Sequence, residues 1–518
     1  MYPRPAKTRK SIEPANGKKT AKKKQGSAQE NPRTLANQIL KNRKTLSVPI
    51  SDMPQGIGLQ RAVSSTYSVT EYQPIAELPE LSSVSEENFN DLLRQKLEQC
   101  CHVCNFADPG SGLKDKDLKS NYLQEIYDYL CKPNFFTLIE PQTLDYFLRM
   151  IKHNVIRSMP PLAELSKVPI FGDDINDKFS ELSWPHLRIV YEIFLKLLDS
   201  KPISPQIFLR CFTAKFIHRI LALFNSADQR ERNYLKMVLF KIYLKFATVR
   251  LTIRQAIQHL FHTYTYEIHY FSGITELLEI MYSIINGFNV PLKEEHKNFL
   301  ITTLLPLYTS NFLHLFHESL FHCVSQYVNK ENTLITHVIK FLMHIWPATY
   351  SFKEAFFVRH LMKYIEMINE DQFVELMIPL FHRIGSCILS TSYQVSELAI
   401  LLWKNDKFIL MTVAHSEVLF PVICPYLYKA GTSHWNTTIR NESVSVIRIF
   451  MVMSNDVFTA YSKSLKNHEL QELKKLDAKK SFWTFLIDNG DIDADDANEK
   501  KKSLDRTFPE LKNFKKTG

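Results

Sequence analysis

The fold is decided by residues 184–224, which read WPHLRIVYEIFLKLLDSKPISPQIFLRCFTAKFIHRILALF. Apolar side chains recur there three or four positions apart, at Leu187, Val190, Tyr191, Phe194 and Leu197 and again at Phe208, Phe212, Phe216, Ile217, Ile220 and Phe224. That period is typical of amphipathic α-helices. The break from Asp199 to Pro205 carries residues that end helices. The stretch therefore predicts two helices separated by a short turn.

The same spacing extends from about Leu78 to Leu470. Breaks such as 225–228, 286–291 and 329–332 separate about sixteen helical runs, which pair into roughly eight hairpins of about 40 to 50 residues. No run alternates with period two over several strands, and glycine is scarce at 13 of 518 residues, so sheets and phosphate loops have few candidate turns. We predict an all-α, HEAT-like solenoid, in which stacked hairpins bury one another's apolar faces and leave a concave surface for partners.

The chain divides into three predicted regions. Residues 1–75 are a basic, Ser- and Pro-rich disordered tail, residues 76–470 are the solenoid, and residues 471–518 are a charged helix to Ile487 followed by a disordered tail. Phe482 and Trp483 are candidate packing anchors of that last helix. Residues 1–45 hold 13 Lys and Arg and two Glu, so this segment carries a net charge of about +11. The whole chain carries +10, so the remaining residues are near neutral. The basic tail is read as a solvated arm, with a nuclear-import signal or a polyanion contact as the alternative.

Composition also bears on the compartment. The eight cysteines fall mostly within apolar helical runs, and no apolar secretory segment follows the basic start of the chain. We therefore expect free thiols and a reducing compartment, the cytoplasm and the nucleus. The longest uncharged stretch, Asn298 to His317, is interrupted by Pro306 and Asn311, which disfavours a membrane span.

Four short patterns that resemble chemical motifs are incomplete. His317 and His322 are five apart, whereas a zincin helix needs its two histidines four apart on one face. The cluster from Cys100 to Cys104 has no second half to complete a tetrahedral metal site. Residues 491–502 lack the glycine and the bidentate glutamate of a calcium loop, and residues 110–114 are too short for a phosphate loop. We expect no catalytic residues, metal or cofactor, although a triad built from distant residues stays open.

Several stretches resemble the B-prime family of regulatory subunits of serine/threonine protein phosphatase 2A. The resemblance covers about Leu78 to Leu470 and is most specific in its middle. The strongest matches are FNSADQRER at 224–232, GITELLEI at 273–280, SIINGF at 283–288 and PLKEEHK at 291–297, supported by KLEQCC at 96–101, WPHL at 184–187 and HWN at 434–436.

The resemblance implies a heterotrimer, in which the solenoid packs on a scaffold subunit, contacts the catalytic subunit and selects substrates. The family recognises a short linear motif, L-x-x-I-x-E, in a groove between neighbouring repeats. By resemblance, the acidic end of the motif would meet Arg250, Lys293 and His296, with Tyr243 and Arg254 alongside. The apolar end would rest on Ile280 and Ile284, with Glu279 at the rim.

Helical spacing is compatible with that assignment. Arg250 and Arg254 are four apart and share a helical face, as do Ile280 and Ile284, which gives one cationic wall and one apolar wall. On spacing alone, the arginines could equally pair with local acids and the isoleucines could be ordinary core.

The chain departs from the family at three positions of this groove. Phe240 and Lys241 stand where the family usually has a histidine and an arginine, and Met237 stands where it has a threonine. Lysine keeps the charge but loses the planar fork, and the two larger apolar side chains could narrow the slot for a leucine. We hypothesise a pocket of altered preference or a weakened one.

An acidic segment before Trp184 supplies a second hypothesis. In the family this connection faces the catalytic subunit, so Asp173, Asp174 and Asp177 could lie near a metal-centred, phosphate-binding site and modulate it. The alternative is a solvated loop.

Two other classes of protein remain as alternatives. One is a HEAT-type adaptor for transport or nucleic-acid binding outside the phosphatase. Its weakness is that the solenoid is near neutral, whereas a nucleic-acid binder needs positive charge. The other is a metal-dependent enzyme that uses His317 and His322, which metal analysis of the purified protein would decide.

Overall fold

The computed structural model describes residues 74–106, 108, 110–133, 135–157, 159, 181–200, 205–268, 270–489 and 494–507 of the chain. These residues form helices and turns, and none of them lies in a β-strand, which confirms the all-α prediction. The chain separates into two units, residues 1–62 and 63–518, and every helix described below belongs to the second. Most of the residues predicted to be disordered, 1–75 and 488–518, lie outside the described residues, but residues 494–507 form a helix where the sequence predicted a disordered tail.

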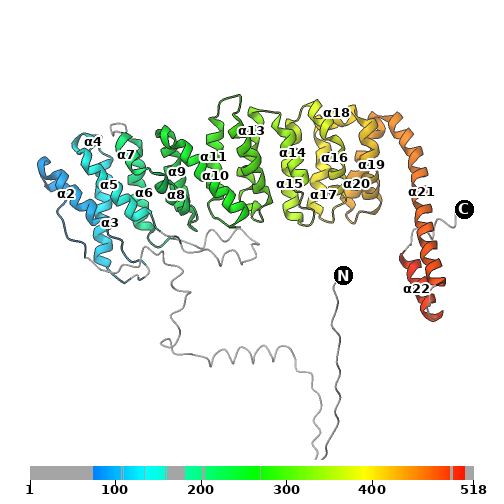
Figure 1. Ribbon diagram of the computed structural model, residues 1–518, viewed down its shortest axis with the longest axis horizontal. Helices are drawn as coiled ribbons and strands as arrows, with labels where there is room; N and C mark the ends of the chain where they lie inside the picture. The colour runs from blue at the N-terminus through cyan, green and yellow to red at the C-terminus, as the bar shows by residue number, and fades with distance from the viewer. Residues whose placement is uncertain are drawn as a thin grey trace, which may run out of the picture. The chain divides into compact units, whose positions relative to one another are not determined.

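Successive helices pair into hairpins, as the spacing predicts (Figure 1). Eight pairs follow one another in the described part of the chain: α2 (Glu86–Gln99) with α3 (Leu113–Leu130), α5 (Pro141–Val155) with α6 (Trp184–Asp199), α8 (Ala214–Leu223) with α9 (Gln229–Lys245), α10 (Arg250–Tyr266) with α11 (Ile274–Asn286), α12 (Glu294–Phe299) with α13 (Leu313–Lys330), α14 (Leu334–His344) with α15 (Ser351–Met367), α16 (Glu370–Ile388) with α17 (Tyr393–Leu401), and α19 (Ser416–Ser433) with α20 (Thr437–Met453).

Shorter elements join or extend these pairs. They are α4 (Phe135–Leu138), α7 (Pro205–Cys211), α18 (Asp406–Ala414), a π-helical turn Leu300–Leu304, and 3₁₀ turns at Leu81–Ser83, Ala247–Val249, Leu305–Thr309 and Leu402–Lys404. Past the last hairpin, α21 (Asn455–Asp488) packs against α19 and α20, and α22 (Ala494–Thr507) packs against α21. The predicted anchors of α21, Phe482 and Trp483, are exposed.

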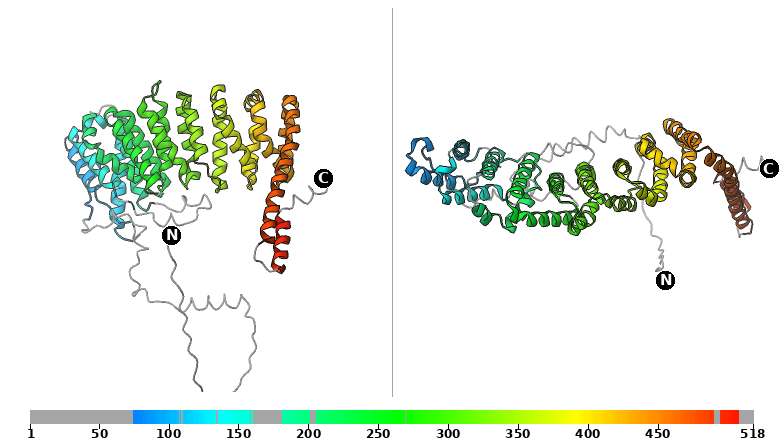
Figure 2. Two further views of the ribbon diagram at one scale, coloured as in Figure 1. Left: turned by 45° about the vertical axis from the view of Figure 1, so that its right-hand side comes forward. Right: turned by 90° about the horizontal axis from the view of Figure 1, so that it is seen from above.

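The hairpins stack in two layers. Each second helix packs on the second helix of the next hairpin, in the order α3, α6, α9, α11, α13, α15, α17 and α20. Most first helices pack on one another in the same way, and α7 packs on α5. Figure 2 shows the helices side by side in one view and end-on from above. This two-layer stacking is the arrangement expected of a HEAT-like solenoid.

The apolar stripes quoted above form the core between these layers. Every one of those eleven side chains, in or directly beside α6, α7 and α8, is at most 5% exposed. The second predicted helix is divided, however, because α7 ends at Cys211 and α8 starts at Ala214. The side chain of Thr213 caps α8 by accepting a hydrogen bond from Phe216 N at 3.3 Å. Apolar spacing alone does not reveal such a break, since both helices bury the same face.

A network of buried polar groups ties the second and third hairpins together at their turns. Arg157, just after α5, donates two hydrogen bonds of 2.7 Å to the carboxylate of Glu231 in α9, and one of 3.0 Å to Glu181. Tyr191 Oη and Ser226 Oγ donate to the same Glu231 carboxylate at 2.9 and 2.6 Å. We call these five residues the turn network.

The next turn is fixed in the same way. Arg232 Nε donates to Glu276 in α11 at 2.7 Å, and Ser272 N donates to Asn225 Oδ1 at 3.2 Å. Gly273 lies so close to the backbone of Phe224 that a Cβ would meet its carbonyl oxygen at 2.5 Å, so a side chain cannot be accommodated without displacement.

A second polar cluster is buried between α13, α15 and the 3₁₀ turn before α13. Tyr308 Oη lies 3.1 Å from His360 Nδ1 and 3.2 Å from Tyr364 Oη, and His317 Nδ1 lies 3.4 Å from His360 Nε2. His317 stacks on Phe356, whereas His322 is largely exposed beside Glu318. The two histidines of the incomplete zincin pattern therefore do not converge, and the described residues contain no group of three possible metal ligands.

We expect the His360 cluster to make the fold sensitive to acid. Burial, together with His317 and Lys363, lowers the pKa of His360 from 6.5 to about 3. The unfolded chain therefore binds a proton below pH 6.5 that the folded chain does not, and the free energy of unfolding falls by up to about 1.4 kcal/mol per pH unit from pH 6.5 towards 3. Denaturant titrations between pH 7 and 5 measure this slope.

The control for this prediction is a pair of single replacements. His360→Gln should flatten the slope, while His337→Gln, at an exposed position of α14, should leave it unchanged. Part of the slope will remain, since burial lowers the pKa of His186 to about 4. Equal slopes in His360→Gln and the native chain would contradict the prediction.

The state of the cysteines and the absence of a membrane span were both predicted from the sequence. All eight cysteines are free thiols. Within the described residues no single helix is long and apolar enough to cross a membrane. Two pairs of helices, α18 with α19 and α20 with the start of α21, have together the length and composition of a membrane span, but each pair is bent sharply between its helices.

Candidate motif-binding site

The residues expected to recognise a motif lie on four consecutive helical elements. Met237, Phe240, Lys241 and Tyr243 are in α9, Arg250 and Arg254 open α10, Glu279, Ile280 and Ile284 are in α11, and Lys293 and His296 lie at the start of α12. α9 packs against α11, and Lys236 of α9 pairs with Glu279 of α11 at 2.6 Å. The third to fifth hairpins therefore supply all of these residues.

Tyr243 is the centre of the polar side of this site. Arg250 Nε donates to Tyr243 O and its Nη2 to Leu244 O, both at 2.9 Å, so this guanidinium caps the C-terminal carbonyls of α9. The same guanidinium lies over the Tyr243 ring at 5.5 Å from its centroid. Arg254 Nη1 contacts Tyr243 Oη at 3.4 Å. Arg250 is thus held mainly by backbone, while Arg254 makes a single side-chain hydrogen bond to the residues that the structure describes.

His296 completes the cationic end. Its ring stacks on Phe288 with centroids 3.7 Å apart. Burial lowers the pKa of His296, and the positive charges of Arg254 and Lys293 lower it further against the opposing effect of Glu295. The imidazole is therefore neutral near pH 7, and the positive charge here comes from Arg254 and Lys293. We call Arg254, Lys293 and His296 the cationic end of the site.

Two buried polar atoms beside the cationic end have no hydrogen-bond partner within the described part of the chain. They are His296 Nδ1 and Tyr327 Oη of α13. Tyr327 packs against Phe288 and lies near enough to Arg254 for that charge to oppose the rise in its pKa caused by burial. Buried polar atoms are usually paired, and a ligand bound beside the cationic end would supply a partner for either of these two. Tyr327 is missed by sequence reasoning, since one Tyr in an apolar stripe looks like core.

The apolar side of the site was expected to be formed by Ile280 and Ile284, but these side chains are not accessible. Ile280 and Ile284 are 2% and 3% exposed and belong to the core between α11 and its neighbours. The accessible apolar side chains nearby are on α9, where Met237 is 41% and Leu244 55% exposed and Phe240 is half-buried. Met237, Lys241 and Leu244 follow one another at helical spacing and so share one face. The sequence did not predict Leu244 as part of this site, because a leucine seven residues after Met237 has the same spacing as a buried core residue.

The remaining predicted residues pair with local partners or lie outside the described residues. Lys241 Nζ binds Asp199 of α6 at 2.6 Å, and both side chains are partly exposed, so the pair adds little stability. Asp173, Asp174 and Asp177 lie outside the described residues. The described chain on either side of their segment, Arg157 and Glu181, belongs to the turn network.

Known proteins are similar in sequence to most of this chain. Residues 78–489 match the family described as protein phosphatase 2A regulatory B subunit (B56 family). The human 56 kDa regulatory subunit alpha isoform of serine/threonine-protein phosphatase 2A is 37% identical over 409 residues, 79% of this chain and 83% of that protein. The mouse beta isoform is 37% identical over 415 residues, 80% and 82% of the two chains. The Caenorhabditis elegans regulatory subunit pptr-1 is 35% identical over 422 residues, 81% and 76%.

Proposed function

The chain belongs to the B56 family of regulatory B subunits of protein phosphatase 2A, and from this premise we propose that it binds the scaffold and catalytic subunits of that phosphatase and selects substrates by a short linear motif. Its role in the phosphatase is regulatory rather than catalytic. The B-prime resemblance inferred from the sequence and the B56 match describe the same membership.

The cationic end is the observation that carries the proposal for motif binding. A glutamate of the motif would accept charge-assisted hydrogen bonds from Arg254 and Lys293 and a neutral one from His296. Its carboxylate would also give His296 Nδ1 or Tyr327 Oη the partner each lacks. A leucine or isoleucine of the motif would bury against Met237 and Leu244, above the core residues Ile280 and Ile284.

Exposed apolar side chains on one edge support the proposal for scaffold binding. Tyr266 is the last residue of α10 and Ile268 follows it, Tyr350 directly precedes α15 and Phe352 is in its first turn, and Trp435 lies between α19 and α20. All five lie at turns from a first to a second helix, and in a solenoid such turns share one edge. Large exposed apolar side chains gathered in this way mark interaction surfaces.

We expect the departures on α9 to change the motif that this chain prefers. Met237→Thr/Phe240→His/Lys241→Arg, which restores the family's usual residues, should shift the selected peptides towards L-x-x-I-x-E and raise affinity for that motif about tenfold, since an arginine fork returns. A peptide-library screen with both proteins measures the difference. Selection of the unmodified family motif by the native chain would refute an altered preference.

The acidic segment is expected to tune catalysis by its partner. If its carboxylates lie near the phosphate-binding site, Asp173→Ala/Asp174→Ala/Asp177→Ala should lower the KM of the assembled phosphatase for a phosphopeptide at least about twofold, because negative charge near an anionic substrate is removed. Unchanged kinetics of the holoenzyme would end this hypothesis.

Assembly itself is tested by mixing the purified chain with a heterodimer of scaffold and catalytic subunits. Size-exclusion chromatography should show a one-to-one-to-one complex that carries the phosphatase activity. Separate elution would leave only the solenoid and favour the alternative, a HEAT-type adaptor for transport or nucleic-acid binding outside the phosphatase.

A further inference from the structure

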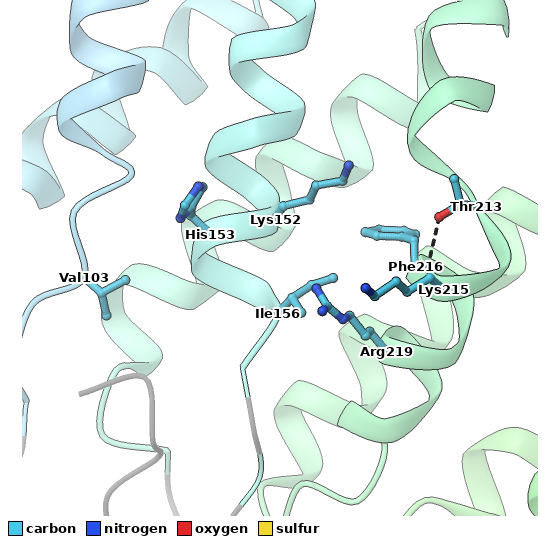
Figure 3. A pocket seen from close by; sticks show the side chains of 8 residues that line it. All are labelled: Val103, Lys152, His153, Ile156, Thr213, Lys215, Phe216 and Arg219. Atoms are coloured by element: carbon cyan, nitrogen blue, oxygen red, sulfur yellow. Dashed lines mark hydrogen bonds between the residues drawn. The ribbon is translucent and has the colours of Figure 1, made fainter. Parts of the chain in front are cut away.

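A groove on the first-helix layer, away from the candidate motif site, is lined by basic side chains. Its main hollow, about 590 Å³, lies between α5 and α8 and is lined by Val103, Lys152, His153, Ile156, Thr213, Lys215, Phe216 and Arg219 (Figure 3). A second hollow of about 260 Å³ shares Lys152 and His153 with the first and continues past Arg149 to Arg210 of α7. We call the two together the α5–α8 groove.

The charges of this groove are unbalanced. Five permanent cations, Arg149, Lys152, Arg210, Lys215 and Arg219, line it against a single carboxylate, Asp145. Helical spacing gathers them, since residues 149, 152 and 153 share one face of α5 and residues 215 and 219 one face of α8. No carboxylate of the described residues forms an ion pair with any of the five, although the solenoid as a whole is near neutral.

The cations of the main hollow come from both of its walls. Figure 3 shows Lys152 extending from α5 towards α8, and Lys215 and Arg219 extending from α8 towards α5. Like charges held near one another repel, and a bound anion converts that repulsion into attraction. An arginine fork and two ammonium groups around one hollow suit a phosphate, which accepts several charge-assisted hydrogen bonds at once.

The floor of the groove is apolar. Phe216 is only 5% exposed and lies under Lys152, whose Nζ is 5.9 Å from the ring centroid. Val103 and Ile156 continue this floor. An apolar side chain could be buried here beside an anionic group, which is the combination that a peptide offers.

We propose that the α5–α8 groove binds a phosphorylated segment of a partner protein. The phosphate lies between Lys152, Lys215 and Arg219, and a neighbouring apolar side chain of the partner packs over Ile156 and Phe216. Nucleic acid fits less well, because single strands are held by exposed aromatic rings on which bases stack, and the ring in this groove is buried.

This inference goes beyond the proposed function, because the groove and the motif site lie on different helices. The groove is built from α5, α7 and α8, whereas the motif site is built from α9 to α12. Variants of the groove are therefore expected to keep both assembly with the phosphatase subunits and binding of an L-x-x-I-x-E peptide, so each proposal can fail without the other.

The test uses the full chain and two random peptide libraries, one with a fixed central phosphoserine and one with serine in its place. The immobilised chain should retain the phosphoserine library at least about tenfold better, and Lys152→Glu/Lys215→Glu should lose this preference. The matched control, Lys404→Glu/Lys429→Glu, reverses two exposed charges of later hairpins and should behave as the native chain. All proteins carry the same basic tail, so the difference isolates the groove.

Three results would overturn the proposal. They are equal retention of both libraries by the native chain, undiminished preference in Lys152→Glu/Lys215→Glu, and binding of an oligothymidine strand that is lost in that variant without any preference for phosphoserine. Should the double reversal lower the melting temperature, Arg219→Gln, at an exposed position, tests the same loss of preference.

Discussion

Replacing Glu231 by alanine is expected to lower the free energy of unfolding by about 3 to 5 kcal/mol, since it breaks a buried ion pair from one side. Glu231 is 0% exposed and accepts hydrogen bonds from Arg157, Tyr191 and Ser226. Without it the buried Arg157 guanidinium loses two of its three hydrogen bonds to carboxylates and keeps only the one to Glu181. Chemical denaturation followed by circular dichroism measures the shift of the first unfolding transition.

The matched control is an ion pair in solvent. Lys340 and Glu375 also pair between neighbouring hairpins, but their side chains are 53% and 52% exposed. Glu375→Ala should therefore cost less than about 1 kcal/mol. A Glu231→Ala chain as stable as Glu375→Ala would mean that the turn network contributes nothing to the fold.

Reversal of the charge at Arg254 is expected to weaken binding of an L-x-x-I-x-E peptide at least about thirtyfold. Loss of one partner of a desolvated charge pair costs about 2 to 5 kcal/mol, and a glutamate at this position would also repel the acidic end of the motif. The effect rests on the contact of Arg254 with Tyr243 and its proximity to His296. Isothermal titration calorimetry with the peptide measures it.

Two further proteins make this result interpretable. Arg254→Lys keeps the charge but loses the planar fork and should fall between the native chain and Arg254→Glu. Lys429→Glu changes the net charge equally, far along the chain, and should bind as the native chain does. If Arg254→Glu binds the peptide normally, the cationic end is not where the motif's glutamate lies.

The fold follows from the sequence because each hairpin buries a continuous stripe. The stripes in residues 184–224 predict α6 and the core faces of α7 and α8 directly, since burial and helical period coincide there. The break at Thr213 is not predictable from apolar spacing, because the cap is a single hydrogen bond that leaves the buried face unchanged.

The candidate site was predictable in part. Its polar residues, Arg250, Arg254, Lys293 and His296, are named by the resemblance, and the structure adds that Arg250 is engaged by the α9 backbone. Spacing could not distinguish a groove wall from core at Ile280 and Ile284, since both positions have the same period.

The stretches that carry the resemblance also meet in space. Phe224 to Arg232 and Gly273 to Ile280 pack through Gly273 against Phe224 and through the pair of Arg232 with Glu276. Long-range contacts of this kind have no signature in a single sequence, because neither stretch shows which other stretch it will touch.

The two-layer stacking has a mechanical consequence. Each hairpin packs mainly on the hairpins before and after it, and we call each such contact between two successive hairpins a joint. The solenoid can therefore bend through small changes of angle between successive hairpins. Such changes add along the solenoid, so a strain below an ångström at one joint becomes a displacement of several ångströms many hairpins away. The turn network stiffens the joint between the second and third hairpins, and the pair of Arg232 with Glu276 stiffens the next joint, which leaves more of the bending to the other joints.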